Sequence, residues 1–257
     1  MYYEPLDAIP LWLLLPLTIG ALTLAMEGGY RSGDWRRSAE PNEQSQPAGS
    51  IVAAILGLLA LVLGFTFSLA ASRFDARRMA VLEESNAIGT TFLRTNMLPE
   101  PQRAQSAQLL RDYANARLTA AQGDHVEEGL KQSEEIQAKL WEHATTASEK
   151  SQNPIMTSLY VQSLNEMIDL NAARVLVSLR SRIPLVIWAV LYGLALLGTA
   201  SVGYYDGLSG TSRSPLMIAL VLTFGVVLYL IADLDRGHEG LLRISQQSMR
   251  DLIGSMK

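Results

Sequence analysis

The sequence predicts an all-α membrane protein with four transmembrane helices and a helical cytoplasmic domain inserted between the second and the third. Three observations lead to this prediction: four long uncharged apolar stretches, a long polar segment after the second stretch, and no strand-like alternation of apolar and polar residues. Of the 257 residues, 49% are hydrophobic and only 18% are charged, whereas an ordinary soluble domain has about 25% charged residues. This deficit of charge is typical of a chain that lies partly in lipid.

The four apolar stretches are long enough to cross a membrane. A helix needs about 20 residues to span about 30 Å of hydrocarbon. No charged residue occurs in any of the stretches, which are 9–26, 51–72, 184–205 and 215–232. Their length and lack of charge favour transmembrane helices over buried core helices.

These crossings divide the chain into parts. We expect a first transmembrane hairpin at 1–72, a cytoplasmic helical domain at 73–183, a second transmembrane hairpin at 184–232 and a cytoplasmic C-terminal tail at 233–257. The loop of the first hairpin starts with Glu27, Gly28 and Gly29. Paired glycines among polar residues are typical of turns, so we expect this loop to be irregular.

The inserted domain is expected to be helical throughout. No helix breaker follows the second crossing before Pro99, so one long helix should continue from the membrane to about Met97. Further helices are expected at 101–121, at 125–150 and from Pro154 toward the third crossing.

Basic residues near the ends of the crossings predict the orientation, because cytoplasmic loops are enriched in Lys and Arg. The side that carries the inserted domain and both termini has Arg73, Arg77, Arg78, Arg174, Arg180, Arg182, Arg236 and Arg243. The opposite side has Arg31, Arg36, Arg37 and Arg213. This excess predicts that both termini and residues 73–183 are cytoplasmic.

The sequence contains no recognisable catalytic pattern. It has no phosphate-binding glycine loop, no HExxH motif and no nucleophile elbow. The absence of cysteine excludes thiolate chemistry, and the three histidines (His125, His143 and His238) are far apart in polar segments. We therefore predict no enzyme activity, no cofactor and no metal site, and the net charge of −4 argues against nucleic acid as a partner.

The second crossing has one face made only of small residues. Its members, spaced by 4, 3, 4, 4 and 3 positions, are Ala53, Gly57, Ala60, Gly64, Ser68 and Ala71. One interpretation is that this small face packs helices closely in lipid, within one subunit. The other is that identical faces from several subunits surround a narrow conduit, with Phe65 or Phe67 forming a hydrophobic gate.

Two charged clusters flank the crossings. Arg73, Arg77 and Arg78 follow the second crossing, where they either anchor the chain to anionic headgroups or place positive potential at the cytoplasmic mouth of a pore. The other cluster, at the end of the fourth crossing, includes Asp233, Asp235, Arg236 and Arg243. It is either solvated at the interface or forms ion pairs with the first cluster, which would couple the C-terminal tail to the gating helix.

Several stretches resemble one known family. They are Gly64-Phe-Thr-Phe-Ser68, Arg73-Phe-Asp-Ala-Arg77-Arg78, Glu83-Glu-Ser-Asn-Ala-Ile-Gly-Thr90 and Asp233-Leu-Asp-Arg-Gly-His-Glu-Gly-Leu-Leu-Arg243-Ile-Ser245. This pattern resembles the bacterial bestrophin-like membrane proteins, otherwise catalogued as a domain of unknown function. One departure is Gly237, which stands where the resemblance leads us to expect proline.

The resemblance has consequences for function. Bestrophins are pentameric ion channels with four membrane helices per subunit, cytoplasmic termini and a pore lined by the second helix. By this likeness we expect a multi-pass protein of the bacterial inner membrane, in contact with lipid and assembled as a homo-oligomer, a pentamer by analogy, that passes small inorganic ions, most simply anions. The alternative is a non-conducting membrane protein whose cytoplasmic helical domain binds a partner or scaffolds an assembly.

Overall fold

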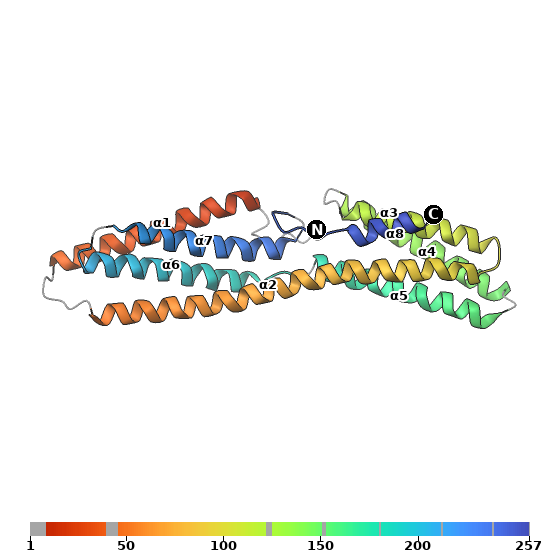
Figure 1. Ribbon diagram of the computed structural model, residues 1–257, viewed down its shortest axis with the longest axis horizontal. Helices are drawn as coiled ribbons and strands as arrows, with labels where there is room; N and C mark the ends of the chain where they lie inside the picture. The colour runs from red at the N-terminus through yellow and green to blue at the C-terminus, as the bar shows by residue number, and fades with distance from the viewer. Residues whose placement is uncertain are drawn as a thin grey trace. The chain divides into compact units, whose positions relative to one another are not determined.

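The computed structural model describes residues 9–39, 46–121, 125–150, 153–179, 181–211, 213–237 and 239–256. Arg180, His238 and residues 1–8, which entered the predictions above, lie outside these ranges. In the described part of the chain, every regular element is helical (Figure 1). The elements are α1 (Leu11–Ala39), α2 (Gln46–Arg94), the 3-10 helix η2 (Thr95–Met97), α3 (Gln102–Ala120), α4 (Val126–Lys150), α5 (Pro154–Leu179), α6 (Leu185–Leu208), α7 (Pro215–Arg236) and α8 (Gln247–Ser255). The predicted all-α class is confirmed.

Four of these helices, α1, α2, α6 and α7, are long and apolar enough to cross a membrane. Apart from residues 9, 10 and 184, they contain the four stretches predicted from the sequence. Helix α2 is a single helix of 49 residues, as expected from the absence of a breaker before Pro99. At a rise of about 1.5 Å per residue, α2 is more than twice as long as a hydrocarbon core is thick. Its C-terminal half therefore extends into a different environment from its N-terminal half.

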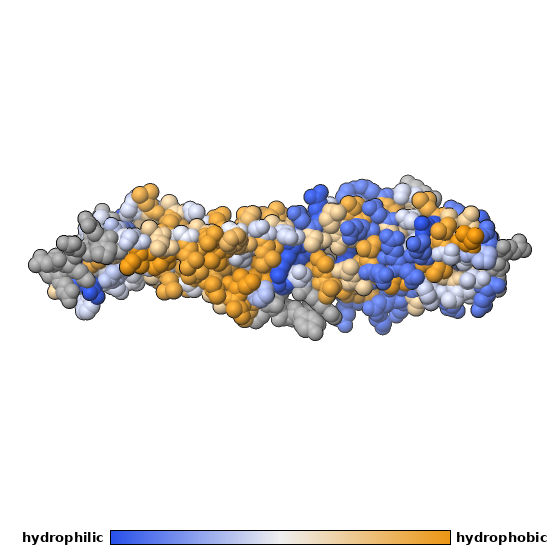
Figure 2. Space-filling model, turned by 90° about the horizontal axis from the view of Figure 1, so that it is seen from below, coloured by the Kyte–Doolittle hydropathy of each residue, from blue (hydrophilic) through white to orange (hydrophobic). Residues whose placement is uncertain are grey.

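The chain forms two compact units, each with its own core. The first unit comprises 1–74 and 182–243, and the second comprises 75–181 and 244–257. The fully buried residues Leu22, Leu59, Leu191 and Leu228 join α1, α2, α6 and α7 in the core of the first unit. Outside this core, large apolar side chains such as Leu61, Leu197 and Leu216 are exposed, and Figure 2 shows a broad apolar surface over these helices. A continuous apolar surface of this kind is suited to lipid.

The second unit contains the C-terminal part of α2, the helices α3, α4 and α5, and the short helix α8. Its core is formed by the fully buried residues Leu110 and Tyr113 of α3, Leu140 of α4 and Leu164 of α5. The short C-terminal helix α8 adds Met249 to the same core. The last residues of the chain therefore belong structurally to the second unit.

The structure corrects one prediction, the irregular loop after residue 26. Helix α1 continues to Ala39, so Gly28 and Gly29 are helical. A Cβ atom at Gly29 would collide with the backbone of Ala200 in α6, and one at Gly33 would collide with the backbone of Tyr204. Gly29 and Gly33 are therefore helix-contact residues rather than turn residues.

The contact is reciprocal. Gly203 and Gly207 of α6 lie against the backbone of Met26 and Tyr30, so a Cβ atom on either glycine would also collide with α1. Two pairs of glycines spaced by four residues thus bring α1 and α6 to backbone contact. Such pairs let helices in lipid gain dispersion energy and weak Cα–H···O bonds that larger side chains would prevent.

This contact predicts the effect of enlarging one glycine. Gly203→Leu should destabilise the first unit by about 3 kcal/mol or more, because the new side chain has only backbone to displace. Gly193→Leu, in the same helix, is the matched control, since a Cβ there meets no described atom within 4 Å. Thermal unfolding of the detergent-solubilised protein should show a lower midpoint for the first variant alone. Equal midpoints would show that the glycine contact does not hold these helices together.

Candidate functional site

The small face of α2 is exposed in the single subunit. Gly57, Ala60, Gly64 and Ser68 are exposed and Ala71 is half-buried, whereas Leu59, Leu63 and Ala70 on the other side of the helix are buried in the core. A Cβ atom at Gly57 or Gly64 would meet no atom of the described residues within 4 Å. Within the described part of one chain, these two glycines are therefore not used for helix packing, unlike the glycines of α1 and α6.

The two phenylalanines predicted as a gate differ in their relation to this face. Phe65 is 69% exposed and Phe67 is 39% exposed. At 3.6 residues per turn, Phe67 lies about 60° around the helix from the centre of the small face, and Phe65 lies about 100° from it on the other side. Phe67 is therefore the better placed of the two to share a surface with Gly64 and Ser68.

The three arginines after the second crossing do not form one exposed group. Arg78 is exposed and Arg73 is half-buried. Arg77 is only 2% exposed, and its guanidinium donates hydrogen bonds to the carbonyl oxygens of Ser181 (2.6 Å) and Val177 (3.4 Å). These carbonyls lie at the C-terminal end of α5, where the last helical turn has no internal donors. The guanidinium of Arg77 therefore caps this helix end, and the role of the three arginines at a pore mouth stays a prediction.

The charged cluster at the end of α7 has local partners. Both oxygens of the buried Asp233 accept backbone N–H groups, from Leu241 at 3.0 Å and from Leu242 at 3.1 Å. Asp235 accepts the N–H of Ile183 at 3.0 Å and lies 3.7 Å from Arg182.

The basic members of the cluster also bind nearby atoms. Arg236 donates to the carbonyl of Ile9 at 2.7 Å, and the exposed Arg243 donates to Gly240 at 3.3 Å. Ion pairs between this cluster and the arginines beyond the second crossing stay a prediction. Backbone groups before α1 and α6 and in the turn after α7 are among the partners of these charges.

The backbone conformation at the end of α7 explains why residue 237 is glycine. It ends α7 with φ at 39°, in the left-handed region, which is the usual position of a C-terminal glycine. Proline cannot adopt this angle because its ring holds φ near −65°. The departure from the expected proline therefore changes how the chain leaves α7.

One buried cluster in the second unit was missed by the sequence analysis. Glu84 of α2 is completely buried, and its carboxylate accepts hydrogen bonds from Arg117 Nε (2.8 Å), from Tyr113 Oη (3.1 Å) and from Arg174 Nη1. Arg174 also donates to Gln246 Oε1 at 3.0 Å. The Glu84 cluster thus connects α2, α3 and α5 with the residue before α8.

The electrostatics of this cluster depend on Glu84. Burial lowers the pKa of Arg174, and the charge of Glu84 opposes this change. Burial and the nearby Glu84 charge both raise the pKa of Tyr113, so its hydroxyl stays protonated and donates. A signal in the sequence existed: Glu84 shares one face of α2 with Val81 and Ile88, and a lone carboxylate in an apolar stripe needs partners.

Comparison with known proteins now adds to this geometry. A family model described as the Bestrophin-like domain matches residues 15–249. The chain belongs to the bestrophin-like family. No curated protein matches the sequence.

Solved structures of bacterial bestrophin homologues share the fold of this bestrophin-like chain. One structure from Klebsiella pneumoniae, solved by Zn-SAD phasing, has 18% sequence identity and a TM-score of 0.61, and the match covers 94% of this chain and 97% of that one. Two point variants of a bestrophin homologue from the same organism give TM-scores of 0.69 at 15% identity, over 95% and 96% of the two chains, and of 0.66 at 16% identity, over 96% and 97%. At such identities the likeness concerns the fold, and it agrees with the four membrane helices and the resemblance noted from the sequence.

In this bestrophin-like protein, the Glu84 cluster predicts a strong effect of one substitution. Glu84→Gln should destabilise the second unit by about 3–5 kcal/mol, because it leaves two buried guanidinium groups without a counter-charge. Glu83→Gln is the matched control, since the neighbouring carboxylate is exposed. Thermal unfolding together with hydrogen exchange in α3 and α5 should report the difference. Indistinguishable variants would mean that Glu84 does not hold these helices.

Proposed function

We propose that this bestrophin-like protein is a homo-oligomeric channel for small anions in the bacterial inner membrane, and that α2 lines its pore. The observation that carries the proposal is the exposed small face of α2, in which Gly57 and Gly64 contact nothing in the described part of their own subunit. This face does not pack inside the subunit and carries no large apolar side chains. Such a face is suited to a symmetry axis, where several copies must approach one another.

The conduit would be narrow and weakly polar. Copies of Gly57, Ala60, Gly64, Ser68 and Ala71 would present backbone, small side chains and one hydroxyl per subunit at successive turns. Ring-like constrictions of this kind select ions by size and by the ease of removing water. Phe67, near the edge of the same face, would supply the hydrophobic constriction.

Anions are favoured by the charges near the end of the pore-lining segment. Arg78 is exposed and Arg73 is half-buried, within two turns of the last small residue. Arg77 is hydrogen-bonded at the end of α5 but still carries its positive charge. Several copies of these charges around an axis would raise the local anion concentration over about one Debye length, near 8–10 Å.

The proposal also assigns places and roles to the remaining parts of the chain. Residues 73–183 and both termini would lie in the cytoplasm, and the Glu84 cluster would stiffen the cytoplasmic bundle. Asp233, Asp235, Arg236 and Arg243 would fix the chain between α7 and α8, so that α8 stays attached to the bundle.

Liposome flux with a glycine variant tests the channel. Wild-type protein reconstituted in liposomes should pass chloride, and Gly64→Leu should reduce the flux at least about tenfold by blocking the conduit. The oligomer mass should stay unchanged, because the side chain has room in the subunit. Gly193→Leu on α6 is the control and should conduct normally.

Other outcomes would reject this proposal. A wild-type protein without flux, or one that is monomeric by mass, would contradict a homo-oligomeric channel. Loss of assembly in Gly64→Leu would instead assign the small face to packing, which is the alternative of a non-conducting scaffold.

The gate can be tested separately. Phe67→Ala should increase chloride flux by widening and wetting the constriction, by about threefold or more. Phe65→Ala is the matched control, since Phe65 lies farther around the helix and should leave flux nearly unchanged. If Phe65→Ala gave the larger increase, the constriction would have to be assigned to the other edge of the face.

A further inference from the structure

A pocket lies between the C-terminal parts of α1 and α6, at the end of the first unit where these helices finish. Its volume is about 440 Å³, and its lining residues are Arg31, Ser32, Trp35, Arg36 and Tyr204. We propose that this pocket binds the phosphate-bearing headgroup of an anionic phospholipid. The proposal is independent of ion conduction, because it concerns a different surface from the small face of α2.

The position of the pocket along both helices fits headgroup depth. Helix α1 starts at Leu11, and about 20 residues are needed to cross the hydrocarbon, which brings the chain to Tyr30. Arg31 follows directly. Helix α6 starts at Leu185, and the same count ends at Tyr204. The lining residues of both helices therefore leave the apolar layer at the same end.

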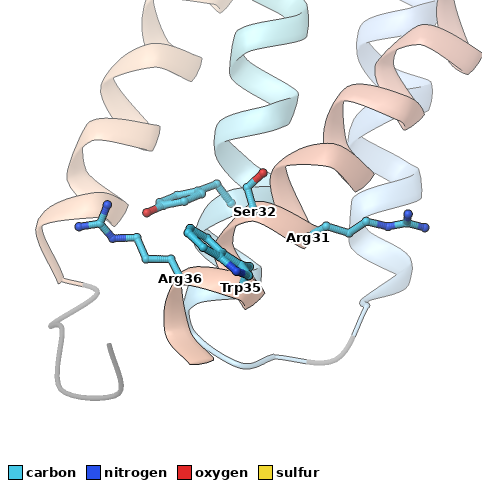
Figure 3. Close-up of a pocket in the computed structure, with 5 residues that line it drawn as sticks. Arg31, Ser32, Trp35 and Arg36 are labelled. Atoms are coloured by element: carbon cyan, nitrogen blue, oxygen red, sulfur yellow. The ribbon is translucent and has the colours of Figure 1, made fainter. Parts of the chain in front are cut away.

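The lining combines cations, hydroxyl groups and an aromatic surface. Figure 3 shows the side chains of Arg31 and Arg36 extending to opposite sides, with Trp35 between them. Trp35 is 75% exposed. An indole at this depth favours the membrane interface, and guanidinium groups bind phosphate oxygens with charge-assisted hydrogen bonds. Tyr204 adds a hydroxyl group to the same lining, whereas the Ser32 hydroxyl donates to the carbonyl of Gly28 at 2.8 Å.

Several charged side chains near the pocket form ion pairs. Arg31 pairs with Glu27 at 2.8 Å, and Arg213 pairs with the same carboxylate at 2.9 Å. Arg37, next to Arg36 in sequence, pairs with Asp34 at 2.6 Å. Arg37 lies outside the lining and Arg36 within it, which makes Arg37 a useful comparison for Arg36.

Exposed apolar or small residues lie on each of the two helices nearer the membrane interior than the pocket. On α1, Gly28 is open, with no described atom within 4 Å of a Cβ position, and Leu24 one turn earlier is 74% exposed. Both lie on the helix face of Ser32 and Trp35, because they are separated by three or four residues or multiples of that spacing. On α6, Leu197 is 63% exposed two turns before Tyr204.

These exposed residues distinguish a lipid from a free anion. A phosphate ion needs only the polar lining, whereas a phospholipid also has acyl chains that would lie along Leu24, Gly28 and Leu197. Burial of acyl methylene groups against exposed leucine side chains adds dispersion energy that a free anion lacks. The combination therefore favours the lipid.

Native mass spectrometry of the full-length, detergent-solubilised protein tests the proposal. Titration with phosphatidylglycerol should show retained lipid, and titration with phosphatidylcholine should show much less. Arg36→Gln should weaken phosphatidylglycerol binding by about tenfold, since one charge-assisted hydrogen bond is lost. Arg37→Gln removes the same charge one residue away and should change the affinity less than about twofold.

Three results would overturn the proposal. The first is equal retention of phosphatidylglycerol and phosphatidylcholine by the wild-type protein. The second is an equal loss of affinity in Arg36→Gln and Arg37→Gln, which would indicate only a general effect of net charge. The third is displacement of phosphatidylglycerol by millimolar inorganic phosphate, which would identify a free-anion site without a role for the acyl chains.

Discussion

The first unit depends on how closely helices can approach in lipid. Hydrophobic attraction between helices is weak in a bilayer, because a leucine side chain is surrounded as favourably by acyl chains as by the side chains of another helix. Gly29 and Gly33 of α1 against Gly203 and Gly207 of α6 solve this problem by backbone contact, with no side chain between the helices. Gly57 and Gly64 of α2 have the same chemistry but no such partner within the described chain. This difference between used and unused glycines is the main structural argument for subunit assembly along α2.

The sequence predicted the parts of this fold that depend on composition and on one helix at a time. Uncharged runs of about 20 residues identified the crossings, and the absence of a breaker before Pro99 predicted the length of α2. Gly28 and Gly29 were misinterpreted because glycine serves both turns and close contacts, and only the partner helix decides between them. A contact between residues about 170 positions apart leaves no local pattern.

The charged residues were the hardest to predict for a related reason. Glu84 can be recognised as unusual in an apolar stripe, but its partners Arg117 and Arg174 are on different helices and have no fixed spacing from it. Arg73, Arg77 and Arg78 follow one another within two turns of the sequence, yet Arg77 is buried and Arg78 is exposed. A helix end left without donors attracts any guanidinium within reach, and this demand arises only when α5 packs beside α2. Periodicity identifies a buried face but does not identify the partner of a charge on it.

The α1–α6 contact also determines what can bind beside it. Arg36 and Trp35 of α1 line the same pocket as Tyr204 of α6 because Gly33 and Gly203 allow the two helices to touch at this depth. A larger residue at either glycine would separate the helices and widen the pocket, although every lining side chain would stay the same. A bound lipid would in turn stabilise only the state in which both helices are in contact, since ligands that bind the folded form alone shift the equilibrium toward it. The proposed lipid binding is therefore thermodynamically linked to helix packing at this end of the first unit.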